Sequence, residues 1–113
     1  MSEFTYLFRG RGTFPSPEET QKHLQKWVAW FKDLNAKGVI KDPGHPLDGK
    51  GKVVRGSQKA IHDGPYAEAK DVVAGYIVVT ARDLAQATEL ATGCPILEVG
   101  GSVEVREVQK MEM

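Results

Sequence analysis

The sequence predicts an α+β fold in which two amphipathic helices cover one face of an antiparallel sheet. The first observation is the order of patterns along the chain: strand, helix, strands, strand, helix, strand, which is a βαββαβ arrangement. The second is length, since 113 residues are enough for one domain, spanning 1–113, with one core. The third is composition, because 41% hydrophobic and 27% charged residues are typical of a soluble globular protein.

The first two elements have clear local signals. Phe4, Tyr6 and Phe8 alternate with other residues, and this period of two with aromatic side chains predicts a half-buried strand. Ser16 and Glu19 have the spacing of a capping box, with a proline at the first helical position. A helix is therefore expected to begin directly after Ser16.

This first helix carries one apolar stripe and ends at a glycine. Lys37 and Gly38 provide a basic last turn followed by a left-handed stop. We expect Trp27 to point toward the core and Trp30 to lie further out, where it contacts a partner, a ligand or the edge of the core. The stripe, at steps of three and four residues, consists of Leu24, Trp27, Val28, Phe31 and Leu34.

The middle of the chain reads as short strands separated by turns. A strand begins at 39–40, and a loop rich in proline and glycine follows over 43–51. Strand pieces at 53–55 and 59–62 flank a turn, and 63–65 form a sharp turn.

The last third predicts a central strand, a second helix and two short strands. The β-branched run 75–80 is typical of a central strand. Asp83 and Gln86 mark the start of the second helix, which ends near Gly93. Strands are expected at 96–99 and 103–108. The core stripe of the second helix consists of Leu84, Ala87 and Ala91.

The predicted order of elements is that of a ferredoxin-like α+β sandwich, which leaves one face of its sheet bare. An apolar bare face must be covered, and a second copy of the chain is the usual solution. We therefore predict a homodimer in which two sheets pack face to face. Such a pair of sheets encloses a cleft that suits a small-molecule ligand.

Charge, hydropathy and cysteine content exclude several classes of protein. Fifteen basic and fifteen acidic residues give a formal net charge of zero, which argues against nucleic acid as the main partner. The longest apolar run, 72–79, is far too short for a membrane span, and residues 1–12 lack the apolar core of a signal peptide. Cys94 is the single cysteine and is expected to be buried. The cytoplasm is therefore the expected location.

Two residues are candidates for acid–base chemistry. His23 lies on the flank of the first helix's stripe, so it can act as a general base at a pocket mouth or simply pack against Trp27. Asp63 ends a strand at a tight turn, so it can orient a histidine, act as an acid, or accept hydrogen bonds within its own turn.

A basic stretch over 50–59 contains Lys50, Lys52, Arg55 and Lys59 and no acidic residue. It can hold an anionic substrate, face an acidic protein surface, or protect the edge of a hairpin.

The histidines do not have the spacing of metal ligands. His45 lies in a breaker-rich loop, and no arrangement with His23, His62 and Asp63 resembles a zinc or iron ligand set. No glycine motif resembles a dinucleotide fingerprint either. We therefore expect no metal and no other cofactor.

The segment 63–70, Asp-Gly-Pro-Tyr-Ala-Glu-Ala-Lys, resembles the D-G-P-F-x-E-x-K signature of DGPF-domain proteins in the YCII-related family. Tyr66 stands in place of the signature phenylalanine, and His62 stands where a small polar residue is usual. The resemblance covers 4–108. It extends to 27–30, Gly38, 46–47, 75–76, 83–87, 93–95 and 100–106.

This resemblance implies a dimeric α+β barrel built from ferredoxin-like units. It implies either a small-molecule enzyme or an accessory protein of alternative sigma factors. The wider superfamily has a proposed His–Asp pair in a pocket. His23 matches its helix histidine by position, and Asp63 is the best candidate for its partner.

Our leading hypothesis is a protein that binds a small polar or anionic molecule. The sequence leaves open whether the chain is an enzyme. If it is, His23 and Asp63 carry a cofactor-independent acid–base step. The candidate ligand-binding residues are Arg9, Trp27, Arg55, His62 and Tyr66. The alternative is a non-enzymatic regulatory protein that contacts a protein partner, such as a sigma factor, through Trp30 and residues 50–59.

Overall fold

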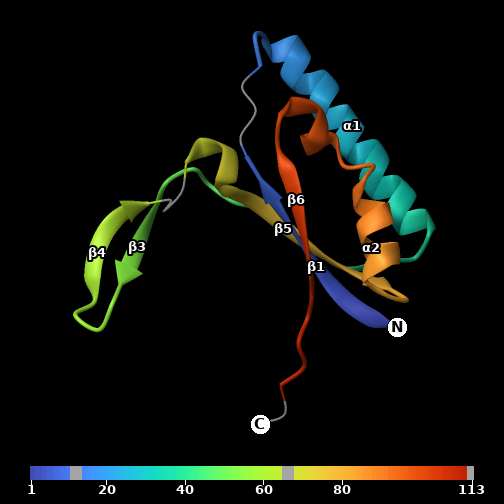
Figure 1. The fold of residues 1–113 in the computed structure, drawn as a ribbon. Coiled ribbons are helices and arrows are strands. Elements are labelled where there is room, and N and C mark those ends of the chain that lie inside the picture. The colour runs from blue at the N-terminus through green and yellow to red at the C-terminus, as the bar shows by residue number, and fades with distance from the viewer. Residues whose placement is uncertain (11–13, 65–67, 112–113) are drawn as a thin grey trace.

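The computed structural model describes residues 1–10, 14–64 and 68–111 (Figure 1). Its elements are β1 (Ser2–Arg9), α1 (Pro17–Ala36), β2 (Ile40–Pro46), β3 (Gly51–Arg55), β4 (Ala60–Gly64), the 3₁₀ helix η1 (Ala69–Asp71), β5 (Val73–Ala81), α2 (Leu84–Ala91), the 3₁₀ helix η2 (Pro95–Val99) and β6 (Ser102–Glu107).

The main sheet has four strands in the order β2-β5-β1-β6, and every neighbouring pair is antiparallel. Both α-helices lie on one side of it (Figure 1). When the β3–β4 hairpin is set aside, this is the ferredoxin-like topology predicted from the order of sequence patterns. The other side of the sheet carries no helix.

The alternation in β1 places the core as predicted. Phe4, Tyr6 and Phe8 are all buried, and Tyr6 pairs with Ile77 on one side and Val105 on the other. Because side chains of directly paired residues share a face of the sheet, these strands present one apolar layer to the helices.

The predicted helix starts are confirmed by hydrogen bonds. The Glu19 amide donates to Ser16 Oγ at 3.2 Å, and the Gln86 amide donates to Asp83 Oδ1 at 2.8 Å. Each bond satisfies an amide that has no partner within its helix. The position of both helices along the chain is therefore determined by local sequence. Gly38 has the left-handed φ of +69° that was expected at the end of α1.

The prediction for the two tryptophans was wrong. Trp30 is only 7% exposed and Leu34 is fully buried, whereas Trp27 is only partly buried. The Trp30 ring contacts Tyr6 and Phe8, with centroids 6.2 and 5.9 Å apart. The helix therefore packs on β1 through the line from Trp30 to Leu34, because a residue and the fourth one after it lie on the same face.

The same rotation of the helix exposes other residues of the predicted stripe. Leu24 and Val28 are 52% and 53% exposed, although both were expected in the core. In α2, Ala87 and Ala91 are buried as predicted, but Leu84 is exposed. On each helix, the stripe of buried residues is narrower than the stripe of apolar residues in the sequence.

Two segments take a different secondary structure from the predicted one. Residues 96–99, expected as a strand, belong to η2, which has Pro95 at its start and Gly100 in the left-handed conformation at its end. Residues 43–46, expected as a loop, belong to the edge strand β2, which is irregular at two points. Prolines are tolerated there because an edge strand leaves one row of amides unpaired.

The strands β3 and β4 form a separate two-stranded hairpin, as the strand–turn–strand pattern predicted. This hairpin stands apart from the main sheet, on the side away from both helices (Figure 1). The radius of gyration is 15.7 Å, whereas a compact chain of this length has about 13 Å. The hairpin is thus a projection from an otherwise compact body.

Candidate functional site

A cavity of about 310 Å³ opens between α1 and the sheet edge formed by β2 and β5. Its walls are mainly aromatic and aliphatic. Its lining includes Phe8, Leu24, Trp27, Phe31, His45 and Tyr76. A concave, largely apolar site with a few polar groups is the usual form of a small-molecule pocket.

Trp27 reaches this cavity because Trp30 fills the core beside it. The Trp27 ring meets Phe8 edge to face, with centroids 5.0 Å apart, and Phe31 at 6.1 Å. Aromatic pairs of this geometry hold each other in place. The structure thus places Trp27, a predicted ligand-binding residue, in the wall of the pocket.

His23 contacts the pocket through Trp27. The indole Nε1 of Trp27 donates a hydrogen bond to His23 Nε2 at 2.9 Å, and the Phe14 ring lies 4.8 Å from the imidazole. A neutral imidazole that accepts at Nε2 carries its proton on Nδ1. The lone pair that a general base needs is therefore already engaged by Trp27. His23 can accept a proton only after this hydrogen bond opens.

Asp63 lies on the projecting hairpin, near the end of β4. Its side chain is 90% exposed and pairs with Lys52 Nζ. Within a single chain, His23 and Asp63 thus belong to different parts of the molecule and each has another partner. Their pairing stays a prediction.

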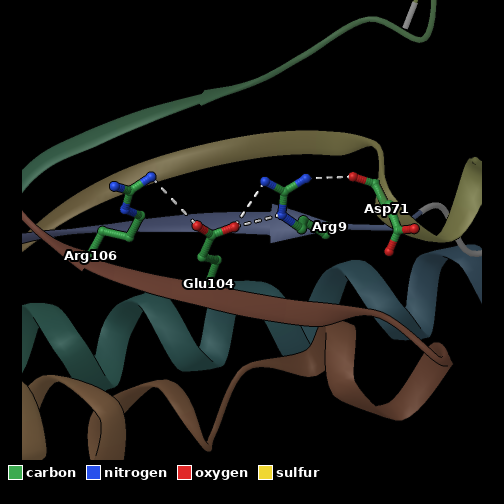
Figure 2. A network of polar contacts seen from close by, with 4 residues as sticks. All are labelled: Arg9, Asp71, Glu104 and Arg106. Carbon is green, nitrogen blue, oxygen red and sulfur yellow. Dashed lines mark hydrogen bonds and ion pairs between the residues drawn. The ribbon is translucent and has the colours of Figure 1, made fainter. Parts of the chain in front are cut away.

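Arg9 belongs to a polar network on the side of the sheet opposite the helices (Figure 2). Its Nε and Nη2 atoms each lie 2.9 Å from Glu104 Oε1, and Nη1 donates to the Asp71 carbonyl oxygen at 2.6 Å. Arg106 approaches the other Glu104 oxygen at 3.8 Å. The guanidinium is occupied by the protein itself, so its predicted binding of an anion would have to displace Glu104.

The remaining predicted ligand-binding residues lie elsewhere. Arg55 and His62 line a shallow depression at the outer end of the hairpin. Tyr66 lies outside the described residues, as do the neighbouring Pro65 and Ala67 of the signature segment. The structure therefore brings neither Arg55 nor His62 to the aromatic cavity.

Sequence reasoning missed His45 and Tyr76 as pocket residues. Their ring centroids are 6.4 Å apart, and both residues line the cavity, although Tyr76 pairs with Leu7 and its side chain therefore lies on the face of the sheet opposite the helices. Gly44 allows this approach, because its φ is +58° and a Cβ there would lie 1.7 Å from the Tyr76 carbonyl oxygen. The signal was a glycine directly before a histidine, in a segment that was interpreted as a loop.

Two buried groups can lose a proton but are held neutral. Burial, and to a lesser degree Cys94 nearby, raises the pKa of Tyr6 to about 12. Burial also raises the pKa of the Cys94 thiol to about 12, against a smaller opposing effect of a backbone hydrogen bond at Ile96. Because the thiolate is the reactive form, Cys94 is a core residue, as predicted. Among the described residues, no cluster of three or more His, Cys, Asp or Glu side chains is positioned to hold a metal ion.

The fold and the cavity together define a small α+β protein of ferredoxin-like topology with an aromatic pocket at one sheet edge. The YCII-related domain matches residues 5–112, so the chain belongs to the YCII-related family. A comparison with curated proteins finds no match.

One solved structure with a similar fold is 5-chloro-2-hydroxyhydroquinone dehydrochlorinase (TftG) from Burkholderia phenoliruptrix AC1100, in complex with 2,5-dihydroxybenzoquinone. Its sequence is 17% identical, the TM-score is 0.51, and the match covers 95% of this chain and 93% of that one. This similarity supports the ferredoxin-like fold. In the described part of the chain, no helix has the length and apolar character required to cross a membrane.

Proposed function

We propose that this protein binds a small, planar, unsaturated molecule with polar or anionic substituents in the cavity between α1 and β2. The observation that carries the proposal is the wall of the cavity, which Phe8, Trp27 and Phe31 line. Aromatic walls favour a flat apolar ring.

The fold relative TftG supports the same ligand class, since the molecule in its structure is an oxygenated six-membered ring. Within the expected class of polar or anionic ligands, we propose one whose body is flat and apolar. If the protein is an enzyme, it performs acid–base chemistry in which His23 exchanges a proton after releasing Trp27. Asp63 would then act from another copy of the chain.

We also propose that the protein works as a homodimer in the cytoplasm. The dimer is supported by the sheet face that carries no helix, and the cytoplasm by a single buried cysteine that cannot form an intrachain disulfide.

The alternative of an accessory protein loses one of its two predicted contacts. Trp30 is buried in the core and cannot meet a partner. The basic residues of the hairpin remain exposed, so the second predicted contact stays a prediction.

The test is a ligand series measured by thermal unfolding and calorimetry. 2,5-Dihydroxybenzoquinone and hydroquinone are compared with succinate, which has polar groups but no ring. We expect the ring compounds to raise Tm and to bind at least about tenfold more tightly than succinate. Trp27→Leu should abolish the difference, whereas Leu84→Ala, at an exposed site on α2, should keep it. Equal responses to ring and chain compounds would contradict the proposal.

A further inference from the structure

A second hollow lies beside the aromatic cavity, between α1 and the first half of the edge strand β2. It is an open groove of about 960 Å³. The residues that line both hollows are Leu24, Trp27, Phe31 and Pro43. The groove therefore adjoins the cavity, and a ligand that fills the cavity can extend into the groove.

The part of the groove next to the cavity is apolar. Leu24 and Val28 lie one helical turn apart on the same side of α1, and they are 52% and 53% exposed. Ile40 of β2 also lines the groove. Single exposed apolar side chains are common on protein surfaces, but these side chains gather in one concave surface. Such a surface can cover an apolar chain.

The groove also has two lysines, Lys32 of α1 and Lys41 of β2. Both are exposed. Among the described residues, no acidic side chain lines the groove and neither lysine forms an ion pair. The acidic residues beside them in sequence are engaged elsewhere, because Asp33 pairs with Lys37 at 3.0 Å and Asp42 accepts a backbone amide at 2.7 Å. The two ammonium groups are therefore available to an anion.

The position of Lys32 sets the length of a ligand that reaches it. From Leu24, which lines both hollows, to Lys32 the helix rises by about 12 Å, since each residue adds about 1.5 Å. A carboxylate attached directly to a ring in the cavity is too close to the ring to span this distance. An apolar chain between ring and carboxylate can span it, and Val28 would lie under that chain.

We propose that the groove is a second part of the ligand site, which binds an apolar chain and its terminal carboxylate. The ligand is then a flat ring in the cavity that bears an alkyl chain ending in an acid, with the acid at Lys32 and Lys41. This inference deepens the proposed function and rests on it. It explains why apolar residues of α1 lie exposed beside two lysines that have no acidic partner among the described residues.

The test of the chain is calorimetry with phenylacetate and 8-phenyloctanoate. Both have a ring and a carboxylate, but only the second has a chain long enough to reach the lysines. We expect 8-phenyloctanoate to bind at least about tenfold more tightly, because its added methylenes leave water. Equal affinities would overturn the proposal.

A substitution in the groove shows whether the chain lies there. Val28→Gln should weaken the binding of 8-phenyloctanoate and leave that of phenylacetate unchanged, because Val28 lines only the groove. Leu84→Gln, at a leucine of α2 that is 53% exposed, is the matched control and should bind both compounds as wild type does. A Val28→Gln variant that binds 8-phenyloctanoate like wild type would contradict the proposal.

A double variant tests the charge. Lys32→Met with Lys41→Met keeps the aliphatic stems, and we expect it to bind 8-phenyloctanoate about fivefold more weakly. The uncharged 8-phenyloctanamide should bind both proteins equally, so the pair of ligands isolates the contact between carboxylate and lysine. Lys50→Met with Lys110→Met removes the same charge at exposed positions outside the groove and should behave as wild type.

Three results with these lysine variants would overturn the proposal. The first is a loss of affinity that is as large in the Lys50/Lys110 control. The second is a Lys32/Lys41 variant that binds 8-phenyloctanoate like wild type. The third is a Lys32/Lys41 variant whose oligomeric mass changes in sedimentation while its ligand affinity does not, because the groove would then be an interface between copies.

The ring compounds separate this inference from the proposed function. If 2,5-dihydroxybenzoquinone and phenylacetate bind but the chain and the lysines add nothing, the groove proposal fails and the proposed function stands. If neither ring compound binds while octanoate binds through Lys32 and Lys41, the proposed ring site fails and the groove stands as a site for the chain.

Discussion

Tyr6 connects the sheet to α2 through a single side chain. It is fully buried, its ring stacks on Trp30, and its hydroxyl donates a hydrogen bond to the carbonyl oxygen of Ala87. A hydroxyl in the core requires such a partner, because an unsatisfied polar group there is costly.

Tyr6→Phe removes this hydrogen bond and keeps the ring. We expect the free energy of unfolding to fall by about 1 kcal/mol, measured by urea denaturation. Tyr76→Phe, at a half-buried ring on the face of the sheet opposite the helices, is the control and should leave stability unchanged. If both variants were as stable as wild type, the buried hydroxyl would make no net contribution.

Stability should fall at alkaline pH because of Tyr6 and Cys94. Both have a pKa of about 12 in the folded protein, above ordinary values of 10.0 and 9.0. Between these values the folded state keeps protons that the unfolded state releases, so rising pH favours unfolding. We expect a stability plateau below pH 9 and a decline from pH 9 to 12.

Variants can assign this decline to the two groups. Tyr6→Phe and Cys94→Ala should each make the fall with pH shallower in denaturation curves, and the double variant should be shallower than either. An unchanged slope in the double variant would mean that other groups cause the alkaline effect.

At the scale of elements, β2 determines the shape of the pocket. This edge strand crosses close to β5 at Gly44, and its pairing with β5 is irregular at two points. Gly38, at the end of α1, has a similar positive φ but open space around it. Comparing substitutions at the two glycines therefore separates the cost of a positive φ from the cost of close approach to another strand.

Gly44→Ala should be much more damaging than Gly38→Ala. At Gly38 only the left-handed conformation is penalised, by about 1 kcal/mol. At Gly44 the strand must also move away from the Tyr76 carbonyl, and we expect a loss of about 3 kcal/mol. Thermal unfolding checks both values, and Gly44→Ala should also weaken ligand binding. Equal losses would show that close approach is unimportant.

At the scale of the whole molecule, stability should depend on concentration. The proposed homodimer stabilises the folded state by mass action. We expect the Tm of wild type to rise with protein concentration. A Tm independent of concentration in wild type would contradict the dimer.

The parts of this fold that were predictable are those encoded by near neighbours. Ser16 and Asp83 cap helices within four residues of themselves, and the alternation of Phe4, Tyr6 and Phe8 identifies a strand face without reference to any other element. The order of these elements was enough to predict the ferredoxin-like topology.

The candidate site was predictable only in part. Trp27 was expected to bind the ligand, and it lines the cavity. The sequence pattern placed Trp27 toward the core, whereas in the structure it reaches the cavity because Trp30 fills the core beside it. His45 was considered only as a metal ligand, because the segment around it reads as a loop. His23 was placed on the correct helix, but its hydrogen bond to Trp27 depends on side-chain orientation that sequence spacing does not specify.

By itself, the sequence determined where both helices begin and the order of the main elements, because capping, periodicity and turn signals act within a few residues. The segment 63–70 indicated the family. Only the tertiary structure decided that Trp30 is buried instead of Trp27, that β2 bends toward β5 to form a pocket, and that the hairpin stands free. Each of these depends on how layers distant in sequence pack together. When the apolar stripe of a helix is broader than the surface that it buries against the sheet, several rotations of the helix about its axis are compatible with the sequence. The shapes of the helix and sheet surfaces then determine which rotation is adopted.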